Sequence, residues 1–515
     1  MLFQSYIFIL LFFPLCLLGF WGLKRQKLLQ LWLIAFSLWF YGAASPYYLL
    51  LLLGSIAWNY AFFRAIGRVS GDAVERAESG MERDSSRKRL LLGIGIAGNL
   101  ALLCFFKYFN AISAGWSQMK GLEDPILQLA LPLGISFFTF QQIGFLADAY
   151  KGEVGACSLR EYVLFVSFFP YVSSGPIVNA QEMLPQYRQI GRQRLDWEKF
   201  AGGLYLFALG LSKKVLLADT LALAVNYGYE NIASLDSLSG IVVACFYTLE
   251  LYFDFSGYSD MAIGVGEMFR IDIPENFNSP YKAVSVKDFW RRWHITLSRF
   301  LQTYIYIPLG GSRKGRFRTF VNTMITFLIS GLWHGANWTF VFWGFLHGLG
   351  VAAAGIGAEA GNGTVTTGNG AAGIDGKRKK ARHILCQAAT FAYVCMAFVF
   401  FRADSLQDGF HLLAKVFSFR VNGQLAQMAA AMEPSEIYIV TKALSLAAPS
   451  LVRAVQIIVL LLMLAVSFFV LSRKNTAQII MRKTVSLRFT LWLAFLFAWS
   501  VISLSGVSTF VYFNF

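Results

Sequence analysis

Charged residues are scarce in this chain, and acidic residues are the scarcer kind. Only 14% of the 515 residues are charged, with 45 Lys and Arg against 29 Asp and Glu. Soluble globular domains carry roughly 25% charged residues, so this composition argues against one. The net charge of +16 does not indicate a nucleic-acid partner, because the basic residues form short clusters between apolar runs. That distribution is typical of the cytoplasmic loops of membrane proteins.

Cysteine and histidine are rare as well. The six cysteines include no Cys-x-x-Cys pair and lie mostly in apolar runs, so neither a zinc site nor a disulfide framework is predicted. The five histidines include no His-x-x-x-His pair. We therefore expect no metal and no bound cofactor.

Apolar residues make up 56% of the chain. A helix needs roughly 20 residues to cross the ~30 Å hydrocarbon layer, and apolar runs of that order recur along the whole length. Examples are residues 6–23, 90–106, 320–349, 384–401, 454–471 and 489–504. The sequence predicts an all-α polytopic membrane protein. We expect roughly 11–13 membrane-spanning or re-entrant helices, together with interfacial amphipathic helices.

Basic clusters predict which ends of the spans face the cytoplasm, because short basic loops resist translocation. The clusters are Lys24–Lys27, the loop 64–90, Arg313–Arg318, Lys377–Lys380 and Arg473–Arg488. Keeping all of them inside places both termini on the outer side.

One basic group conflicts with this alternation. Residues 188–199 follow an apolar stretch, 163–178, that Pro170 and Pro176 interrupt. Strict alternation would put these basic residues outside. A re-entrant hairpin near Gly175-Pro176 would resolve the conflict, provided that protein buries its backbone.

Composition divides the chain into three parts. Residues 1–354 form a core that contains the two most unusual histidines. The interval 355–382 is predicted to be a flexible cytoplasmic linker, because residues 355–376 are rich in Gly, Thr and Ala. Residues 383–515 form a C-terminal transmembrane extension, in which 403–450 is expected to be an external loop.

Labelling of single cysteines tests this topology. In an otherwise cysteine-free variant, cysteines at positions 314 and 379 should resist impermeant thiol reagents applied from the outer side. A cysteine at 428 should react, because the interval 403–450 carries balanced charge. Labelling at 314 from outside would invert the predicted topology.

His334 lies in the apolar run Gly331-Leu332-Trp333-His334-Gly335-Ala336-Asn337. Ionisable groups at membrane depth are rare and usually line a cavity or a substrate path. The flanking glycines would leave the backbone bare and allow a substrate to approach the imidazole. Burial favours a neutral imidazole, which can accept a proton, so acid–base chemistry is expected here. The alternative is a packing histidine that bonds a neighbouring carbonyl.

His294 lies in an amphipathic segment, residues 289–306. Trp290 and Trp293 fall on the apolar side of a helical wheel, and Arg291 and Arg292 on the other. The segment is predicted to be one helix at the cytoplasmic interface, anchored by its tryptophans. His294 lies at the edge of the apolar face of this helix. It is expected to point into the protein, and the alternative is a polar residue at the border of the apolar face with no function of its own.

The other polar groups have simpler interpretations. On a continuous helix His347 would be about 220° round from His334, so a structural role is expected. Glu250, Asp254 and Asp260 lie in an aromatic, apolar run and need partners. Ion pairing with Lys213, Lys214 or Arg292 is the favoured interpretation, and proton relay or substrate orientation is the alternative.

Taken together, these residues resemble the membrane-bound O-acyltransferase superfamily, and specifically its bacterial branch that contains the alginate O-acetylation membrane protein. The resemblance covers almost the full length. The matching stretches are Leu131–Phe140, Gly175-Pro176, Leu251–Ala262, Glu275–Asn278, Phe289–Ser298, Tyr306–Gly311, Gly331–Asn337, Phe400–Ala403 and Phe510–Phe515.

The resemblance implies helices around a central funnel in a bacterial inner membrane, with periplasmic termini. It also implies an acyl transfer for which His334 is essential and His294 is the second signature position. We expect His334 to act as general base, and His294 to orient the acyl group or stabilise the oxyanion. The residues expected to contact the substrate are Trp333, Asn337, Trp293, Arg292, Asp254 and Asp260.

The implied reaction moves an acetyl group from a cytoplasmic donor, acetyl-CoA, to an extracellular polysaccharide such as alginate or cellulose. Implied partners are periplasmic SGNH-type acetyltransferase subunits, a polysaccharide synthase or secretion complex, and membrane lipids. D-alanyl or peptidoglycan acyl transfer by the same fold is an alternative. A transporter subunit without chemistry of its own is another, although no internal symmetry between the halves supports it.

Overall fold

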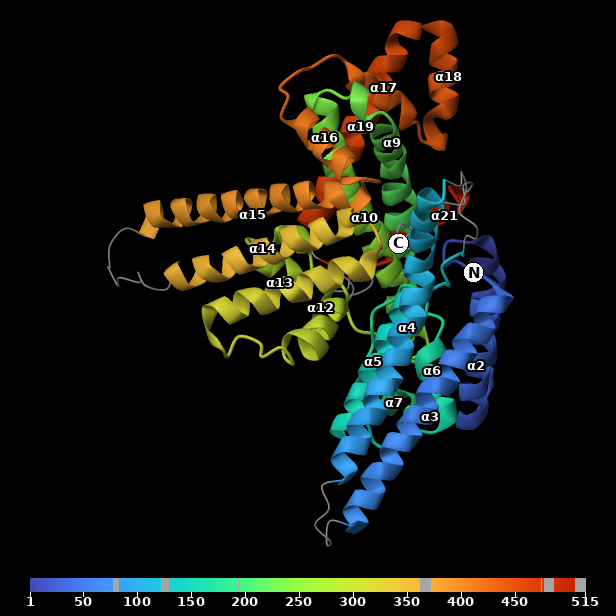
Figure 1. The fold of residues 1–515 in the computed structure, drawn as a ribbon. Coiled ribbons are helices and arrows are strands. Elements are labelled where there is room, and N and C mark those ends of the chain that lie inside the picture. The colour runs from blue at the N-terminus through green and yellow to red at the C-terminus, as the bar shows by residue number, and fades with distance from the viewer. Residues whose placement is uncertain are drawn as a thin grey trace. The chain divides into compact units, whose positions relative to one another are not determined.

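A computed structural model describes residues 1–76, 83–121, 129–192, 194–361, 372–473, 475–476 and 486–504. The described residues form helices and connecting turns and contain no strand (Figure 1). They divide into two compact units, Met1–Phe207 with Met261–Pro274, and Ala208–Asp260 with Glu275–Phe515. The predicted fold class, an all-α polytopic membrane protein, is confirmed.

Six of the described helices are long and apolar enough to cross a membrane. They are Pro46–Val69, Ser86–Met119, Ser237–Met268, Trp338–Gly355, Arg378–Arg402 and Pro449–Ser472. Shorter apolar helices, such as Leu487–Ile502, accompany them. The total of 11–13 spans and the central funnel stay predictions.

The first unit is built on an antiparallel helical core. Its elements are η1 (Phe8–Phe12), α1 (Phe13–Gly22), α2 (Gln26–Gly42), α3 (Pro46–Arg76), α4 (Arg83–Met119), α5 (Ile135–Lys151), α6 (Leu159–Ser167), α7 (Ala180–Gln189) and most of α8 (Trp197–Ser212). The amides of Asn59 in α3 and Asn99 in α4 bond each other in both directions, at 3.0 and 2.6 Å. Both side chains are buried, and such paired amides satisfy polar groups that a bilayer cannot solvate.

Helices α6 and α7 form a buried hairpin. All residues from 164 to 178 are buried, including the turn at Pro170 and Pro176. The end of α7 lies beside the start of α6. Arg188 Nε near the end of α7 donates to Glu161 Oε1 near the start of α6 at 2.8 Å. A hairpin near Gly175-Pro176 with its backbone covered by protein is the arrangement that the conflict with the basic residues 188–199 suggested. That it enters the membrane and leaves on the same side stays a prediction.

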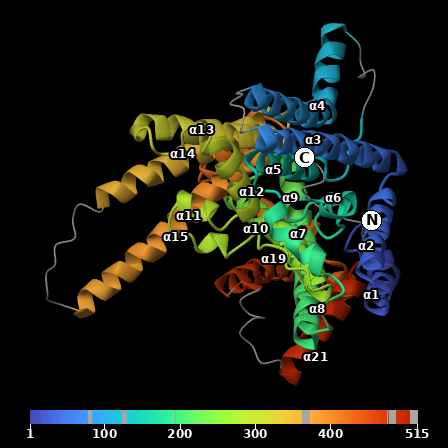
Figure 2. The ribbon, with the colours of Figure 1, turned by 90° about the horizontal axis from the view of Figure 1, so that it is seen from below.

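The second unit holds both unusual histidines. Its elements are the end of α8, η3 (Lys213–Ala218), α9 (Asp219–Glu230), most of α10 (Ser237–Met268), α11 (Val286–Trp290), α12 (Ile295–Leu301), η6 (Gln302–Tyr306), α13 (Gly315–His334), α14 (Trp338–Gly361), α15 (Ala372–Arg402), α16 (Leu406–Val416), α17 (Gln424–Ala431), α18 (Tyr438–Ala447), α19 (Pro449–Ser472) and α21 (Leu487–Ile502). Helix α14 packs along both α13 and α15, and the three lie side by side in Figures 1 and 2.

Several predicted loops contain helix. Within the predicted linker 355–382, helix α14 continues to Gly361 and helix α15 begins at Ala372. The linker belongs to the second unit. Helices α3 and α4 likewise extend into the loop 64–90, and α16, α17 and α18 occupy most of the interval 403–450. The predicted C-terminal motif Phe510–Phe515 lies outside the described residues.

Position 428 is a poor labelling site, because Met428 is fully buried in α17. The expectation that a cysteine there would react readily is therefore wrong. Phe419, which is 88% exposed in the same interval, is the better position for the external probe.

Glycines allow α13 and α14 to pack closely. A Cβ on Gly331 would lie 2.4 Å from the carbonyl oxygen of Phe340, and one on Gly344 would lie 2.4 Å from that of Phe327. A Cβ on Gly335 would meet the ring of Phe340 at the same distance. These glycines thus serve helix contact, and not the open substrate approach that the sequence suggested.

Replacing Gly331 by alanine should therefore force α13 and α14 apart. We expect Gly331→Ala to destabilise the protein by about 1–3 kcal/mol, the usual effect of overpacking. Gly54→Ala is the matched control, because nothing lies within 4 Å of a Cβ at that position. Thermal unfolding in detergent should show a lower midpoint for the first variant only. Equal midpoints would contradict the packing role.

Candidate active site

His334 is the last residue of α13, and its side chain is 2% exposed. Three aromatic rings surround the imidazole, with ring centroids 4.7 Å away for Trp333, 5.0 Å for Trp343 and 4.9 Å for Phe401. Helices α13, α14 and α15 each contribute one of these rings. The helix triplet therefore holds His334 in one orientation in an apolar setting.

His294 interrupts the helix that was predicted for residues 289–306. Helix α11 ends at Trp290, α12 begins at Ile295, and His294 between them has φ 43° in the left-handed region. The physical reason is a second set of backbone bonds: Ile295 N–H donates to Asn276 O, and Asn278 N–H donates to Arg292 O. The prediction of one continuous interfacial helix is wrong.

The tryptophans of this segment are core residues and not interfacial anchors. Trp290 is 7% exposed and Trp293 is 2% exposed. Trp290 packs against Phe327 of α13, with ring centroids 5.0 Å apart. Their burial fixes α11 against α13 and α14, and so positions the turn that carries His294.

Hydrogen bonding fixes which nitrogen of His294 carries the proton. Asn276 Oδ1 lies 3.0 Å from His294 Nδ1 and also accepts from the backbone N–H of Thr296 and from its hydroxyl. A backbone N–H can only donate, so the atom facing it is the amide oxygen, and His294 Nδ1 must donate to that oxygen. In the neutral imidazole the lone pair is then on Nε2. This nitrogen can accept a proton or a hydrogen bond but has no hydrogen to donate.

His294 is completely buried and lies outside the six candidate spans. Burial lowers the pKa of His294 to about 3, so the imidazole is neutral near pH 7. Its ring centroid is 4.7 Å from that of Phe255 and 6.5 Å from that of Trp333. Trp333 also contacts His334, so its indole ring lies between the two histidines and touches both.

Of the predicted substrate-contacting residues, only the two tryptophans lie in this aromatic cluster. Asn337 is exposed, and its amide donates to Asp404 O at 2.6 Å and accepts from Thr339 N–H at the start of α14. Arg292 pairs with Asp288 at 3.0 Å, one helical turn earlier. Both contacts are with protein and stabilise local structure.

The two predicted carboxylates have lysine partners. Asp254 of α10 lies 2.7 Å from Lys214 Nζ, and Asp260 lies 2.6 Å from Lys213 Nζ. Lys214 also pairs with Asp219 at 2.7 Å. These bonds match the ion-pairing interpretation for both lysines, whereas Arg292 is not their partner.

Sequence reasoning missed Asn276, whereas the contacts of His347 agree with the structural role expected of it. His347 is fully buried, accepts from Trp290 Nε1 at 3.1 Å and shares Trp343 with His334. The angle of 220° assumed a helix that in fact breaks at residues 335–337. Asn276 lies in one of the family-like stretches, but no local pattern indicated its bond to a histidine 18 residues away.

No group of three or more His, Cys, Asp or Glu side chains in the described parts of the chain could hold a metal ion. The imidazoles of His294 and His334 lie in an aromatic setting, and a neutral imidazole can accept a proton or a hydrogen bond from a hydroxyl group.

Comparison with known proteins decides the family. The model of the membrane-bound O-acyltransferase family, MBOAT, matches residues 87–357. The chain belongs to the membrane-bound O-acyltransferase family. It is an O-acyltransferase, and the predicted resemblance to this family and to its alginate O-acetylating members is confirmed.

Three relatives show the range of the family. The chain is 39% identical to a peptidoglycan O-acetyltransferase of Helicobacter pylori, over 80% of this chain and 79% of that protein. It is 36% identical to a probable alginate O-acetylase, AlgI, of Pseudomonas putida, over 81% of each. A teichoic acid D-alanyltransferase of Streptococcus thermophilus is 31% identical, over 42% of this chain and 55% of the length of that protein.

The buried ion pair tests the structural role of α10. Breaking a buried ion pair lowers the free energy of unfolding by ~3–5 kcal/mol. We expect Asp254→Ala to give a value near the lower end of this range, because Lys214 still pairs with Asp219. The control is Asp272→Ala, whose partner Lys199 is 43% exposed, and whose loss should change stability by about 0–1 kcal/mol. Unfolding midpoints of the two variants in detergent measure the difference. Equal midpoints would contradict the role assigned to the buried pair.

Proposed function

We propose that this O-acyltransferase moves an acetyl group from cytoplasmic acetyl-CoA across the membrane, for O-acetylation of a glycan on the outer side. The observation that carries the proposal is the aromatic cluster of the second unit, in which Trp333 contacts both His294 and His334. Relatives that transfer acetyl groups match about four-fifths of the chain, whereas the D-alanyl transferase matches 42%. This difference favours acetyl over D-alanyl.

His334 is the proposed general base. One imidazole nitrogen takes the proton of the acceptor hydroxyl, and the hydroxyl oxygen attacks the thioester carbonyl. The carbon–sulfur bond then breaks, the new ester bond remains, and the CoA thiolate leaves with the proton that His334 held. Such catalysis contributes roughly 10²–10⁴ in rate.

His294 is proposed to orient the acceptor. Because its Nδ1–H is bonded to Asn276, its Nε2 can accept from a hydroxyl but cannot donate to an oxyanion. The two roles expected from the sequence are orientation of the acyl group and stabilisation of the oxyanion. Neither suits an acceptor nitrogen, because an acetyl thioester and an oxyanion have no hydrogen to donate, whereas a hydroxyl has one. Asn276 is a positioning residue, since it acts through His294.

The direction of transfer follows from the charge pattern. Helix α13 begins next to the basic residues Arg313–Arg318 and ends at His334, roughly 28 Å away at 1.5 Å per residue. If the basic end is cytoplasmic, His334 lies toward the outer side, where an acceptor arrives. Phe401 and Asp404, which border the interval 403–450, lie at the same end of the helix triplet. This geometry supports a cytoplasmic donor and an outer acceptor.

The acceptor is proposed to be a polysaccharide such as alginate or cellulose, reached through a periplasmic SGNH-type partner and a polymer secretion complex in the inner membrane. Peptidoglycan is the second candidate, because the peptidoglycan-acetylating relative is 39% identical. Deleting the gene and measuring ester-linked acetate separately in exported polysaccharide and in muropeptides distinguishes the two. Loss from neither fraction would contradict the proposal.

The two histidines should respond differently to asparagine. His334→Asn should abolish acetylation, because an amide is not a base near neutral pH. His294→Asn should retain measurable activity, because its carbonyl can still accept a hydrogen bond and asparagine tolerates the left-handed backbone. Acetate content of the polymer, normalised to protein in the membrane, is the readout. Equal losses at equal abundance would contradict this division of roles.

A further inference from the structure

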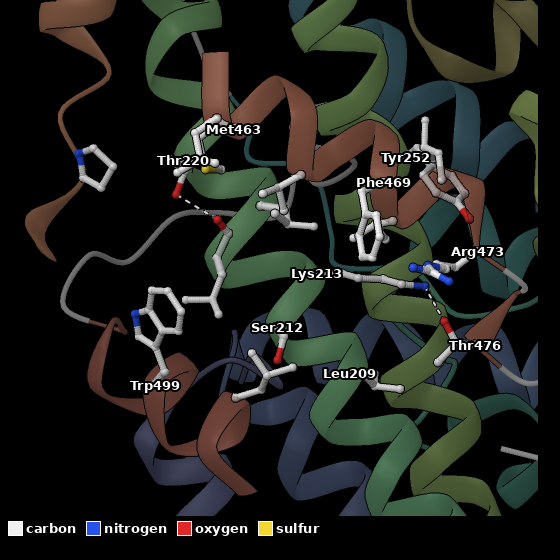
Figure 3. A pocket seen from close by; sticks show the side chains of 18 of the residues that line it. Leu209, Ser212, Lys213, Thr220, Tyr252, Met463, Phe469, Arg473, Thr476 and Trp499 are labelled. Atoms are coloured by element: carbon white, nitrogen blue, oxygen red, sulfur yellow. Dashed lines mark hydrogen bonds between the residues drawn. The ribbon is translucent and has the colours of Figure 1, made fainter. Parts of the chain in front are cut away.

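A cavity lies in the second unit, and neither His294 nor His334 lines it. It has a volume of about 620 Å³, within the usual range for small-ligand sites. Helix α19 contributes the largest share of its wall, and η3 and α21 contribute further parts (Figure 3). Its lining is largely apolar, and includes Leu209, Leu216, Met463, Phe469, Leu496 and Trp499.

Helix α19, which contributes the largest share of this cavity's wall, is a candidate membrane span with little of its surface buried. Helix α19 is the most apolar of the candidate spans, and only 17% of its central window is buried within the protein. Its lining residues run from Val459 to Leu471, which corresponds to roughly 18 Å along the helix. One leaflet of the hydrocarbon layer is about 15 Å thick, so the cavity matches the length of a single lipid chain.

Positive charge gathers at one end of the cavity. Figure 3 shows Lys213, Arg473 and Thr476 together there, with Trp499 and Thr220 toward the other end. Lys282 lines the same end and bonds the last carbonyls of α19, Ser472 O at 3.0 Å and Arg473 O.

Only one of these three cations is neutralised by a carboxylate. Lys213 pairs with Asp260 at 2.6 Å. Within the described chain, Lys282 and Arg473 form no ion pair, and the Arg473 guanidinium lies over the Phe469 ring at 4.2 Å. Two positive charges therefore remain at the mouth of an apolar cavity, at the end of α19 that the basic clusters predict to be cytoplasmic.

We propose that this cavity binds an anionic phospholipid of the cytoplasmic leaflet, with one acyl chain along α19 and the phosphate between Arg473 and Lys282. The apolar wall suits the chain, and the two cations suit a phosphate diester, which bonds guanidinium and ammonium groups well. A zwitterionic lipid would place a cation of its own beside them and should bind more weakly.

The bound lipid would lie one residue layer from the candidate active site. Tyr252 lines the cavity and contacts Phe277 edge to face, with ring centroids 5.8 Å apart. Asn475, another lining residue, donates to Phe277 O at 2.7 Å, and Phe277 follows the Asn276 that holds His294. The lipid is thus placed to stabilise the segment that positions His294.

Native mass spectrometry of the purified, delipidated full-length protein tests the proposal. The probes are dioleoylphosphatidylglycerol and dioleoylphosphatidylcholine, titrated separately. We expect the anionic lipid to bind with an affinity at least about tenfold higher, because each basic residue at the rim adds to the attraction. Equal affinities for the two lipids would overturn the proposal.

Two pairs of variants locate the binding. Lys282→Gln with Arg473→Gln should remove the preference for the anionic lipid, whereas Arg316→Gln with Arg318→Gln, which removes the same charge elsewhere, should retain it. Met463→Trp should block the cavity and weaken binding of both lipids. Leu461→Trp is its control, because Leu461 is 51% exposed on α19 and does not line the cavity. A preference that survives the first pair, or binding that survives Met463→Trp, would overturn the assignment.

Discussion

The candidate active site depends on one constraint: polar groups inside a membrane protein must find their partners within the protein. His294 meets it by donating Nδ1–H to Asn276, and the same bond leaves the Nε2 lone pair for chemistry. The backbone of residues 276–278 pairs with that of 292–295 for the same reason, and this pairing bends the chain at His294. The same segment, residues 276–278, therefore determines the bend of the chain at His294, the tautomer of its imidazole and the position of its side chain.

Close helix packing supplies the rest of the site. Gly331 and Gly344 let the backbones of α13 and α14 touch, which places His334, Trp343 and Phe401 in one cluster. The surrounding rings leave His334 buried in an apolar setting. Ion pairs of Lys213 and Lys214 secure the neighbouring α10 without contributing a group to this cluster.

Much of this arrangement could be predicted from the sequence, and the failures have a common cause. Apolar run length predicted the polytopic fold. The basic residues 188–199 suggested a hairpin where α6 and α7 form one, and the apolar settings of His294 and His334 singled them out among five histidines. Periodicity failed wherever tertiary contacts outweigh it. Periodicity gives no sign that the backbone of residues 276–278 bonds that of 292–295, so it predicted one helix where the chain bends at His294. It also gives no sign that α13 ends at His334, so the angle assumed between His334 and His347 was wrong. Partners distant in sequence, such as Asn276, leave no local signal.

The central claim is that a neutral histidine takes the proton of the acceptor hydroxyl. The pH dependence of acetyl transfer by the purified protein in nanodiscs, from acetyl-CoA to a soluble oligosaccharide, tests it most directly. The account predicts that kcat/KM stays level or rises as the pH increases from mildly acidic to neutral, because the imidazole must be deprotonated in the free enzyme. A kcat/KM that falls over this range, as a step requiring a protonated histidine would produce, would contradict the claim.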